Sequence, residues 1–217
     1  WLNLNGEWDF QLDPGASWEE QELYKDADAY AKKINVPFCP ESELSGIGHT
    51  DFMNSVWYRR EVELEEKQLE GRVLLHFGAV DYMATIYVNG EKCGTHKGGY
   101  VSFAVDITDH VHAGKNTIVV NAADDTRSRL IPSGKQSEKY NSYGCQYTRT
   151  TGIWQTVWLE FVPENYIKKV KYVTDIEAGT LTIMAELVGK GTFLAETFYK
   201  GKPAGAASHI SGGGTAV

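Results

Sequence analysis

Apolar and polar residues alternate with a period of two along many short segments of this chain. This alternation is typical of strands that bury one face, because successive side chains of a strand point to opposite sides. Each such strand must cover its apolar face with a second sheet, so the pattern predicts an all-β sandwich. The expected strands cover residues 3–12, 56–64, 72–77, 83–88, 101–107 and 116–122.

Asn89 and Gly90 directly follow the expected strand 83–88. An Asn-Gly pair readily adopts the positive φ angles of a two-residue hairpin turn. We therefore expect the chain to reverse here and to continue as a neighbouring antiparallel strand.

The segment 153–160 has the most distinct two-faced pattern. In one continuous strand, its aliphatic face would consist of Ile153, Gln155, Val157 and Leu159. The opposite face carries Trp154 and Trp158, and two interpretations of this pair stay open. Burial against a neighbouring domain is favoured, because so much apolar area is rarely left in water. Stacking on a sugar ring is the alternative, since aromatic faces suit the C–H surfaces of a pyranose.

Three further segments depart from the pattern of the first sandwich. Ser17-Trp-Glu-Glu20 has the spacing of a capping box and predicts a short helix. Residues 123–150 form a long polar loop, and long loops within compact domains are often functional. We expect this loop to project toward a partner domain or a sugar. Beyond Pro163, alternation over 168–174, 180–187 and 192–199 predicts strands of a second sandwich.

Charge and composition exclude several classes of protein. The 217 residues carry a formal net charge of −8, which argues against nucleic-acid binding because phosphates require a basic surface. No run of about 18 apolar residues occurs, so we expect no membrane span. The chain starts at Trp1 without an apolar signal segment, which is typical of a processed or cut chain. Our expectation is a soluble protein of the bacterial cytoplasm or periplasm.

The cysteines and histidines give no sign of a metal centre. Three widely spaced cysteines form neither a disulfide framework nor a zinc ligand pair, so we expect free, partly buried thiols. These are Cys39, Cys93 and Cys145. His76 lies in an apolar run and is expected in the core, whereas His110 and His112 are expected on a surface loop.

Four segments resemble, in order, the N-terminal sugar-binding domain of glycoside hydrolase family 2, the beta-galactosidase, beta-glucuronidase and beta-mannosidase group. They are Leu4-Asn-Gly-Glu-Trp-Asp-Phe10, Asp51-Phe-Met-Asn-Ser-Val-Trp-Tyr-Arg-Arg-Glu61, the segment from Gly78 to Gly90, and Tyr147-Thr-Arg-Thr-Thr-Gly-Ile-Trp-Gln-Thr-Val-Trp-Leu-Glu160. The resemblance implies a jelly-roll domain of the galactose-binding type over 1–163. It also implies that 164–217 is an incomplete immunoglobulin-like sandwich.

The resemblance also implies a role. Enzymes of this family cleave β-glycosides with retention, using two glutamates on a (β/α)8 barrel that this chain lacks. We therefore expect a non-catalytic domain of a beta-galactosidase-like enzyme, with no catalytic residue, metal or cofactor of its own. Its expected partners are the missing barrel and a carbohydrate. The sequence shows no nucleophile elbow and no P-loop.

Individual site residues follow from the same resemblance. Gln146 stands where the beta-galactosidase pattern has an aspartate that helps hold sugar and sodium. A neutral amide is a poorer cation ligand, which puts the metal role in doubt, but Gln146 can still bind sugar hydroxyls. Arg149 either pairs with a barrel carboxylate or pins its own loop, and the second interpretation is favoured. Lys135, Gln136 and Asp124 complete the expected substrate-facing set.

Some alternatives remain open from the sequence. Asp124 with Asp125 also fits a simple acidic turn, and a calcium role is possible for the pair although no calcium-loop motif is present. The whole chain could instead be a free-standing carbohydrate-binding module that acts through Trp154 and Trp158. A protein-binding sandwich of the adhesion type is the third and least favoured class.

Overall fold

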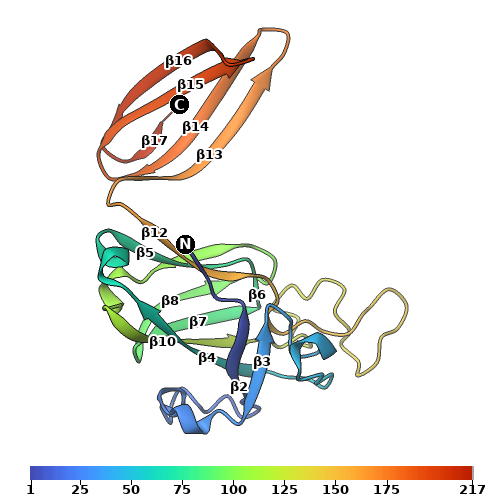
Figure 1. Ribbon diagram of the computed structural model, residues 1–217. Coiled ribbons are helices and arrows are strands. Elements are labelled where there is room, and N and C mark those ends of the chain that lie inside the picture. The colour runs from blue at the N-terminus through green and yellow to red at the C-terminus, as the bar shows by residue number, and fades with distance from the viewer. Residues whose placement is uncertain (217) are drawn as a thin grey trace. The chain divides into compact units, whose positions relative to one another are not determined.

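The computed structural model describes residues 1–216. It divides into two compact units, Trp1–Phe161 and Val162–Val217, which are built of strands; the first unit also contains short 3-10 helices (Figure 1). The expectation of an all-β fold is confirmed. Among the described residues, no helix is long and apolar enough to cross a membrane.

The first unit is a jelly-roll sandwich of two main antiparallel sheets. One sheet has the order β3 (Lys32–Val36), β2 (Gly6–Leu12), β4 (Ser55–Leu64), β10 (Gly114–Ala123), β7 (Met83–Val88) and β8 (Glu91–Lys97). The other has the order β1 (Leu2–Asn3), β12 (Val157–Val162), β5 (Arg72–Phe77) and β9 (Phe103–Asp106). A two-stranded ribbon joins β6 (Val80–Asp81) to β11 (Gly152–Ile153).

The core lies between the two main sheets. Val56, Tyr58 and Leu64 lie on one face of β4, and all three are buried in this core. The turn at Asn89 and Gly90 has the expected positive φ angles, 52° and 84°, and joins β7 to β8. Alternation therefore identified the strands that enclose the core.

Two predicted strands are broken in the structure. The expected strand 153–160 divides into β11 and β12, and the chain bends between them at Gln155. Gln155 is consequently exposed, and its assignment to the core face was wrong. The expected strand 3–12 is likewise divided, because Leu4 and Asn5 lie between β1 and β2.

The predicted helix after Ser17 is also wrong. Residues 18–22 form turns, and two 3-10 helices follow, η1 (Leu23–Lys25) and η2 (Ala27–Ala29). Ser17 does not cap them; instead Asp13 accepts hydrogen bonds from the main-chain nitrogens of Ser17 and Trp18, both at 3.1 Å. This segment covers the outer face of the larger sheet with an aromatic cluster, whose members are Trp18, Tyr24, Tyr30, Trp57, Tyr87 and Val119.

Three other 3-10 helices lie in connections: η3 (Glu43–Ser45), η4 (Glu66–Leu69) and η5 (Thr108–His110). The three cysteines are free, as expected, although Cys145 is exposed. His76 is not a core residue: its ring stacks on Trp158 with centroids 4.7 Å apart, and its Nε2 lies 2.8 Å from the carboxylate of Glu160.

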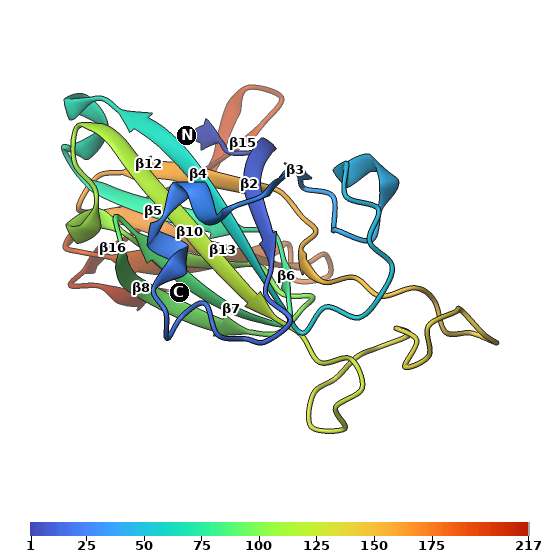
Figure 2. The same ribbon diagram turned by 90° about the horizontal axis from the view of Figure 1, so that it is seen from below.

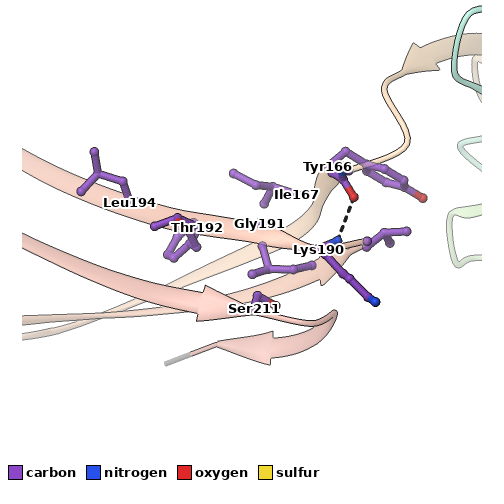
Figure 3. A pocket seen from close by; sticks show the side chains of 12 residues that line it. Tyr166, Ile167, Lys190, Gly191, Thr192, Leu194 and Ser211 are labelled. Carbon is purple, nitrogen blue, oxygen red and sulfur yellow. Dashed lines mark hydrogen bonds between the residues drawn. The ribbon is translucent and has the colours of Figure 1, made fainter.

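The second unit contains two small antiparallel sheets. One has the order β13 (Tyr166–Asp175), β14 (Thr180–Val188) and β17 (Gly214–Ala216), and the other pairs β15 (Gly191–Tyr199) with β16 (Lys202–Ser211). A mainly apolar cavity of about 350 Å³ lies within this unit, bordered by residues such as Ile167 and Leu194 (Figure 3). At its rim, the main-chain nitrogen of Lys190 donates a 2.8 Å hydrogen bond to the Asn165 side chain. The strands expected at 168–174, 180–187 and 192–199 are all present.

Candidate functional site

A long loop, residues 124–151, leaves β10 and returns as β11. Figure 2 shows it extending beyond the strands at the end of the first unit where β6 lies. The loop has little regular structure, but it is cross-linked by main-chain hydrogen bonds. The nitrogen of Tyr147 donates to the carbonyl of Lys135 at 2.8 Å, and the nitrogen of Ser137 donates to the carbonyl of Tyr147 at 2.7 Å. These bonds give the loop a fixed shape.

Two buried carboxylates lie at the base of the loop. Asp81 ends β6 and is 1% exposed, and Asp124 follows β10 and is 4% exposed. The strands bring them together, because β10 pairs with β7 and the nitrogen of Tyr82 donates to the carbonyl of Ala123 at 3.4 Å. Oδ1 of Asp81 and Oδ2 of Asp124 are buried without a hydrogen-bond partner in the described part of the chain.

Burial is the main cause of the raised pKa values of these two carboxyl groups. Loss of hydration raises the pKa of Asp124 to about 8, with smaller contributions from the negative charges of Asp81, Glu41 and Asp125. Loss of hydration also raises the pKa of Asp81 to about 6, partly offset by a hydrogen bond from Gln136. At neutral pH the folded protein therefore keeps Asp124 mostly protonated.

Gln136 connects this base to the loop. Its Nε2 donates to Oδ2 of Asp81 at 2.8 Å, and its Oε1 accepts from the nitrogen of Thr150 at 2.6 Å. The next residue along the chain, Thr151, donates its main-chain nitrogen to both oxygens of Glu41 at 3.0 and 3.1 Å. The nitrogen and the oxygen of the Gln136 side-chain amide are thus both bonded within the protein, which leaves little capacity for a ligand.

Arg149 lies inside the loop and is 3% exposed. Its guanidinium donates to the main-chain carbonyls of Ser137 at 3.1 Å and Lys139 at 2.6 Å, and also to those of Thr50 and Tyr140. The guanidinium also lies over the ring of Phe52, 4.1 Å from its centroid. These contacts are those of a residue that holds its own loop in shape.

The outer part of the loop encloses a polar cavity of about 330 Å³, which we call the loop cavity. Gln146 lies on it, and in the orientation that satisfies its neighbours its amide nitrogen donates to the carbonyls of Gln136 at 3.1 Å and Lys135 at 3.3 Å. Its carbonyl oxygen is then available to a ligand. The residues that line the cavity are Thr126, Arg127, Ser128, Arg129, Ile131, Ser133, Gln136, Glu138, Tyr143 and Gln146.

The two tryptophans have different neighbours. Nε1 of Trp154 donates to the carbonyl of Gly99 at 2.8 Å, and its ring meets Tyr100 edge-on at 5.8 Å. Trp158 stacks on His76 and borders a separate groove of about 360 Å³. The bend at Gln155 lies between the two tryptophans, so they do not share one continuous strand.

The structure thus separates the predicted site residues into groups. Gln136 and Gln146 border the loop cavity, and Lys135 is exposed beside them. Asp124 and Arg149 are buried beneath the loop surface, out of reach of a ligand. Among residues 1–216, no three His, Cys, Asp or Glu side chains gather as a metal site.

Sequence reasoning missed two residues of the base, Asp81 and Glu41. Both are buried acids that accept hydrogen bonds from the loop or its end. A signal for Asp81 was present, because an aspartate within the apolar run Gly78 to Val88 is a candidate for a buried carboxylate. Glu41 has no comparable signal, because its burial depends on contact with Thr151, 110 positions later.

The fold and this loop define a jelly-roll sandwich of the galactose-binding type with one polar loop cavity at its end. Residues 2–163 match the sugar binding domain of glycosyl hydrolases family 2. The chain therefore belongs to glycosyl hydrolase family 2.

The similar proteins are named after two different enzymes, beta-glucuronidase and beta-galactosidase. A putative beta-glucuronidase of Formosa agariphila is 33% identical over 152 residues, which are 68% of this chain and 17% of that protein. A beta-galactosidase of Thermoanaerobacter pseudethanolicus is 33% identical over 159 residues, which are 69% of this chain and 20% of that protein. The chain thus spans about a fifth of the length of these curated relatives.

A solved structure, the beta-glucuronidase of Ruminococcus gnavus, matches 98% of this chain and 37% of its own, with a TM-score of 0.69 and 22% identity. At that identity the match shows the shared fold alone.

Proposed function

We propose that this chain is a non-catalytic, N-terminal part of a retaining glycosidase that hydrolyses β-glycosides. The observation that carries the proposal is the match of residues 2–163 to the family's sugar binding domain. In this role the jelly roll is a scaffold, and the long loop presents Gln146 and the loop cavity to the substrate. The catalytic groups belong to a barrel domain outside this chain.

The two buried carboxylates at the base of the loop support a non-catalytic role. A retaining glycosidase needs two carboxyl groups about 5–5.5 Å apart, on opposite sides of the scissile bond. Asp81 and Asp124 are adjacent but only 1% and 4% exposed, so a sugar cannot enter between them. Their unpartnered oxygens and raised pKa values are explained by burial rather than by contact with a substrate.

Hydrolysis of aryl glycosides tests this proposal. The purified 217-residue chain and the longer protein that carries it are incubated with p-nitrophenyl β-galactoside, β-glucuronide and β-mannoside. We expect no turnover by the chain and hydrolysis by the longer protein, with the product formed in the β configuration. Robust hydrolysis by the chain alone would overturn the non-catalytic role, and an α product would overturn retention.

A second candidate function is sugar binding by the chain itself through Trp158. The groove beside this residue is lined by Trp1, Asn3, Thr156 and Glu160 and combines an aromatic face with polar groups, as a pyranose requires. Oligosaccharide binding that is lost in Trp158→Ala, with the fold intact, would favour this module function. Unchanged binding in that variant would exclude the groove.

A further inference from the structure

The long loop differs in charge from the rest of the chain. Residues 124–151 contain five basic and three acidic residues, a net charge of +2, whereas the whole chain carries −8. The other residues therefore carry −10. One of the three loop acids, Asp124, is buried beneath the surface. The exposed part of the loop is consequently a basic region on an acidic protein, which attracts anions.

The exposed cations of this loop have no carboxylate partners within ion-pair distance in the part of the chain that the structure describes. These residues are Arg127, Arg129, Lys135 and Lys139. Elsewhere an arginine such as Arg59 is paired twice, with Asp9 at 3.0 Å and Glu61 at 2.7 Å. The charges of the loop are therefore available to a ligand.

Arg127 is also held in place. Its guanidinium lies over the ring of Phe52, 4.3 Å from the centroid, and the buried Arg149 contacts the same ring at 4.1 Å. A cation–π contact does not use the N–H donors of a guanidinium, which stay free to bind a carboxylate with two parallel hydrogen bonds. Arg127 thus combines an unpaired charge with a restricted orientation.

Arg127 and Arg129 line the loop cavity, together with hydroxyl and amide groups suited to a sugar. Ser128, Ser133 and the available oxygen of Gln146 provide donors and acceptors for hydroxyl groups, and Tyr143 provides a ring. The volume of about 330 Å³ is at the lower end of ligand sites, which suits a single sugar ring. Glu138 is the one acid of its lining.

We propose that the loop cavity is a subsite for an acidic sugar, whose anionic group is bound by Arg127 and Arg129. This inference rests on the proposed function, because it names the substrate class that the loop presents to the rest of the enzyme. Arg127 and Arg129 are then specificity-determining residues, and Gln146 binds a hydroxyl of the same ring.

Sugar titrations of the ¹⁵N-labelled chain, followed by NMR, test the proposal. Glucuronate and glucose differ only in the carboxylate, and galacturonate and galactose form a second matched pair. We expect shifts confined to the long loop and binding of each acid at least about tenfold tighter than its neutral partner, as a charge-assisted bidentate contact provides. Glucose 6-sulfate tests whether the subsite prefers a sulfate ester to a carboxylate. If it binds more tightly than glucuronate, the acidic subsite is supported and its ligand is assigned as a sulfated sugar.

Three variants complete the test. Arg127→Gln and Arg129→Gln should each weaken glucuronate binding about tenfold and leave the spectrum dispersed. Lys97→Gln is the control, because it removes the same charge at an exposed position outside the loop; its binding should stay within about twofold of wild type.

Several results would overturn the inference. They are equal binding of acidic and neutral sugars, wild-type binding by both arginine variants, an equal loss in Lys97→Gln, or no shift in the loop with any sugar. The proposed function is tested separately. If the longer protein hydrolyses neutral β-galactosides and the chain binds acidic sugars no better than neutral ones, the role in a glycosidase stands and the acidic subsite is overturned.

Discussion

Gln136 and Asp81 lie 55 positions apart in the chain, and the Gln136 side chain donates a 2.8 Å hydrogen bond to the Asp81 carboxylate. The same amide group accepts from the nitrogen of Thr150, just before β11. One buried side chain in the middle of the long loop therefore joins the C-terminal end of the loop to the sandwich.

Gln136→Ala should loosen the loop. The change leaves Asp81 and the nitrogen of Thr150 without a partner, and each such loss costs about 1–3 kcal/mol. We expect a lower free energy of unfolding and faster proteolysis within 124–151. Gln21→Ala, at an exposed position, is the control. Urea unfolding would contradict this prediction if the two variants were equally stable.

Asp124 should make stability depend on pH. Its pKa is about 8 in the folded state against an ordinary 3.8, so between these values the folded state keeps a proton that the unfolded chain releases. The contribution of Asp124 to stability is therefore fully present below about pH 4 and falls by up to about 1.4 kcal/mol per pH unit as the pH rises toward 8. Asp81, with its pKa raised to about 6, adds to the same trend.

Asp124→Asn should remove much of this slope, because asparagine stays neutral. Thermal unfolding between pH 4.5 and 9 should show the variant more stable than wild type at pH 8 and similar to it at pH 4.5. Asp125→Asn, at the exposed neighbouring position, should follow the wild-type curve. Parallel curves for Asp124→Asn and wild type would show that this carboxyl does not control the effect.

Gly99→Ala should be strongly destabilising. A Cβ at this position would lie 2.2 Å from Oδ1 and 2.3 Å from Cγ of Asp81, and the buried carboxylate has no free space. Overpacking of this kind costs about 1–3 kcal/mol. Gly15→Ala, whose Cβ would meet only Ser17 at 3.6 Å, is the control. Equal melting temperatures for the two variants would be inconsistent with the close approach at Gly99.

Arg149→Lys should destabilise the loop although the charge is kept. A lysine ammonium cannot reproduce the planar contacts to four main-chain carbonyls and the ring of Phe52. A loss of about 3 kcal/mol is expected for a buried, unpaired charge. Arg129→Lys, at an exposed position, should leave unfolding unchanged. Wild-type stability of Arg149→Lys would argue for the ligand-binding interpretation instead.

Much of the sandwich follows from sequence alone, because period-two alternation depends only on which face of a strand is buried. Val56, Tyr58 and Leu64 illustrate this, as does the turn at Asn89 and Gly90. The bend at Gln155 was not predictable in this way, because an interruption of a strand does not change which residue types precede and follow it. The predicted helix failed because Asp13, rather than Ser17, caps the segment and aromatic packing determines its path.

The site was only partly predictable. The resemblance led to Gln136, Gln146 and Arg149 as substrate-facing residues of one loop; the structure places all three in that loop, but Gln136 and Arg149 are buried there. Asp81 and Glu41 were missed because contacts across 55 and 110 positions bury them, and no local motif marks such contacts. The same burial places Asp124 beneath the surface, although its place in a polar loop suggested exposure.

The central claim is that the long loop faces the substrate of a larger glycosidase. The most direct test is kcat/KM of the longer protein for aryl β-glycosides, with Gln146→Ala compared with Gln21→Ala. We predict about a tenfold loss for Gln146→Ala, as expected when a hydrogen bond to a substrate hydroxyl is removed, with unchanged melting temperature and an unaffected control. Identical kcat/KM values for Gln146→Ala and wild type on every hydrolysed substrate would contradict the account.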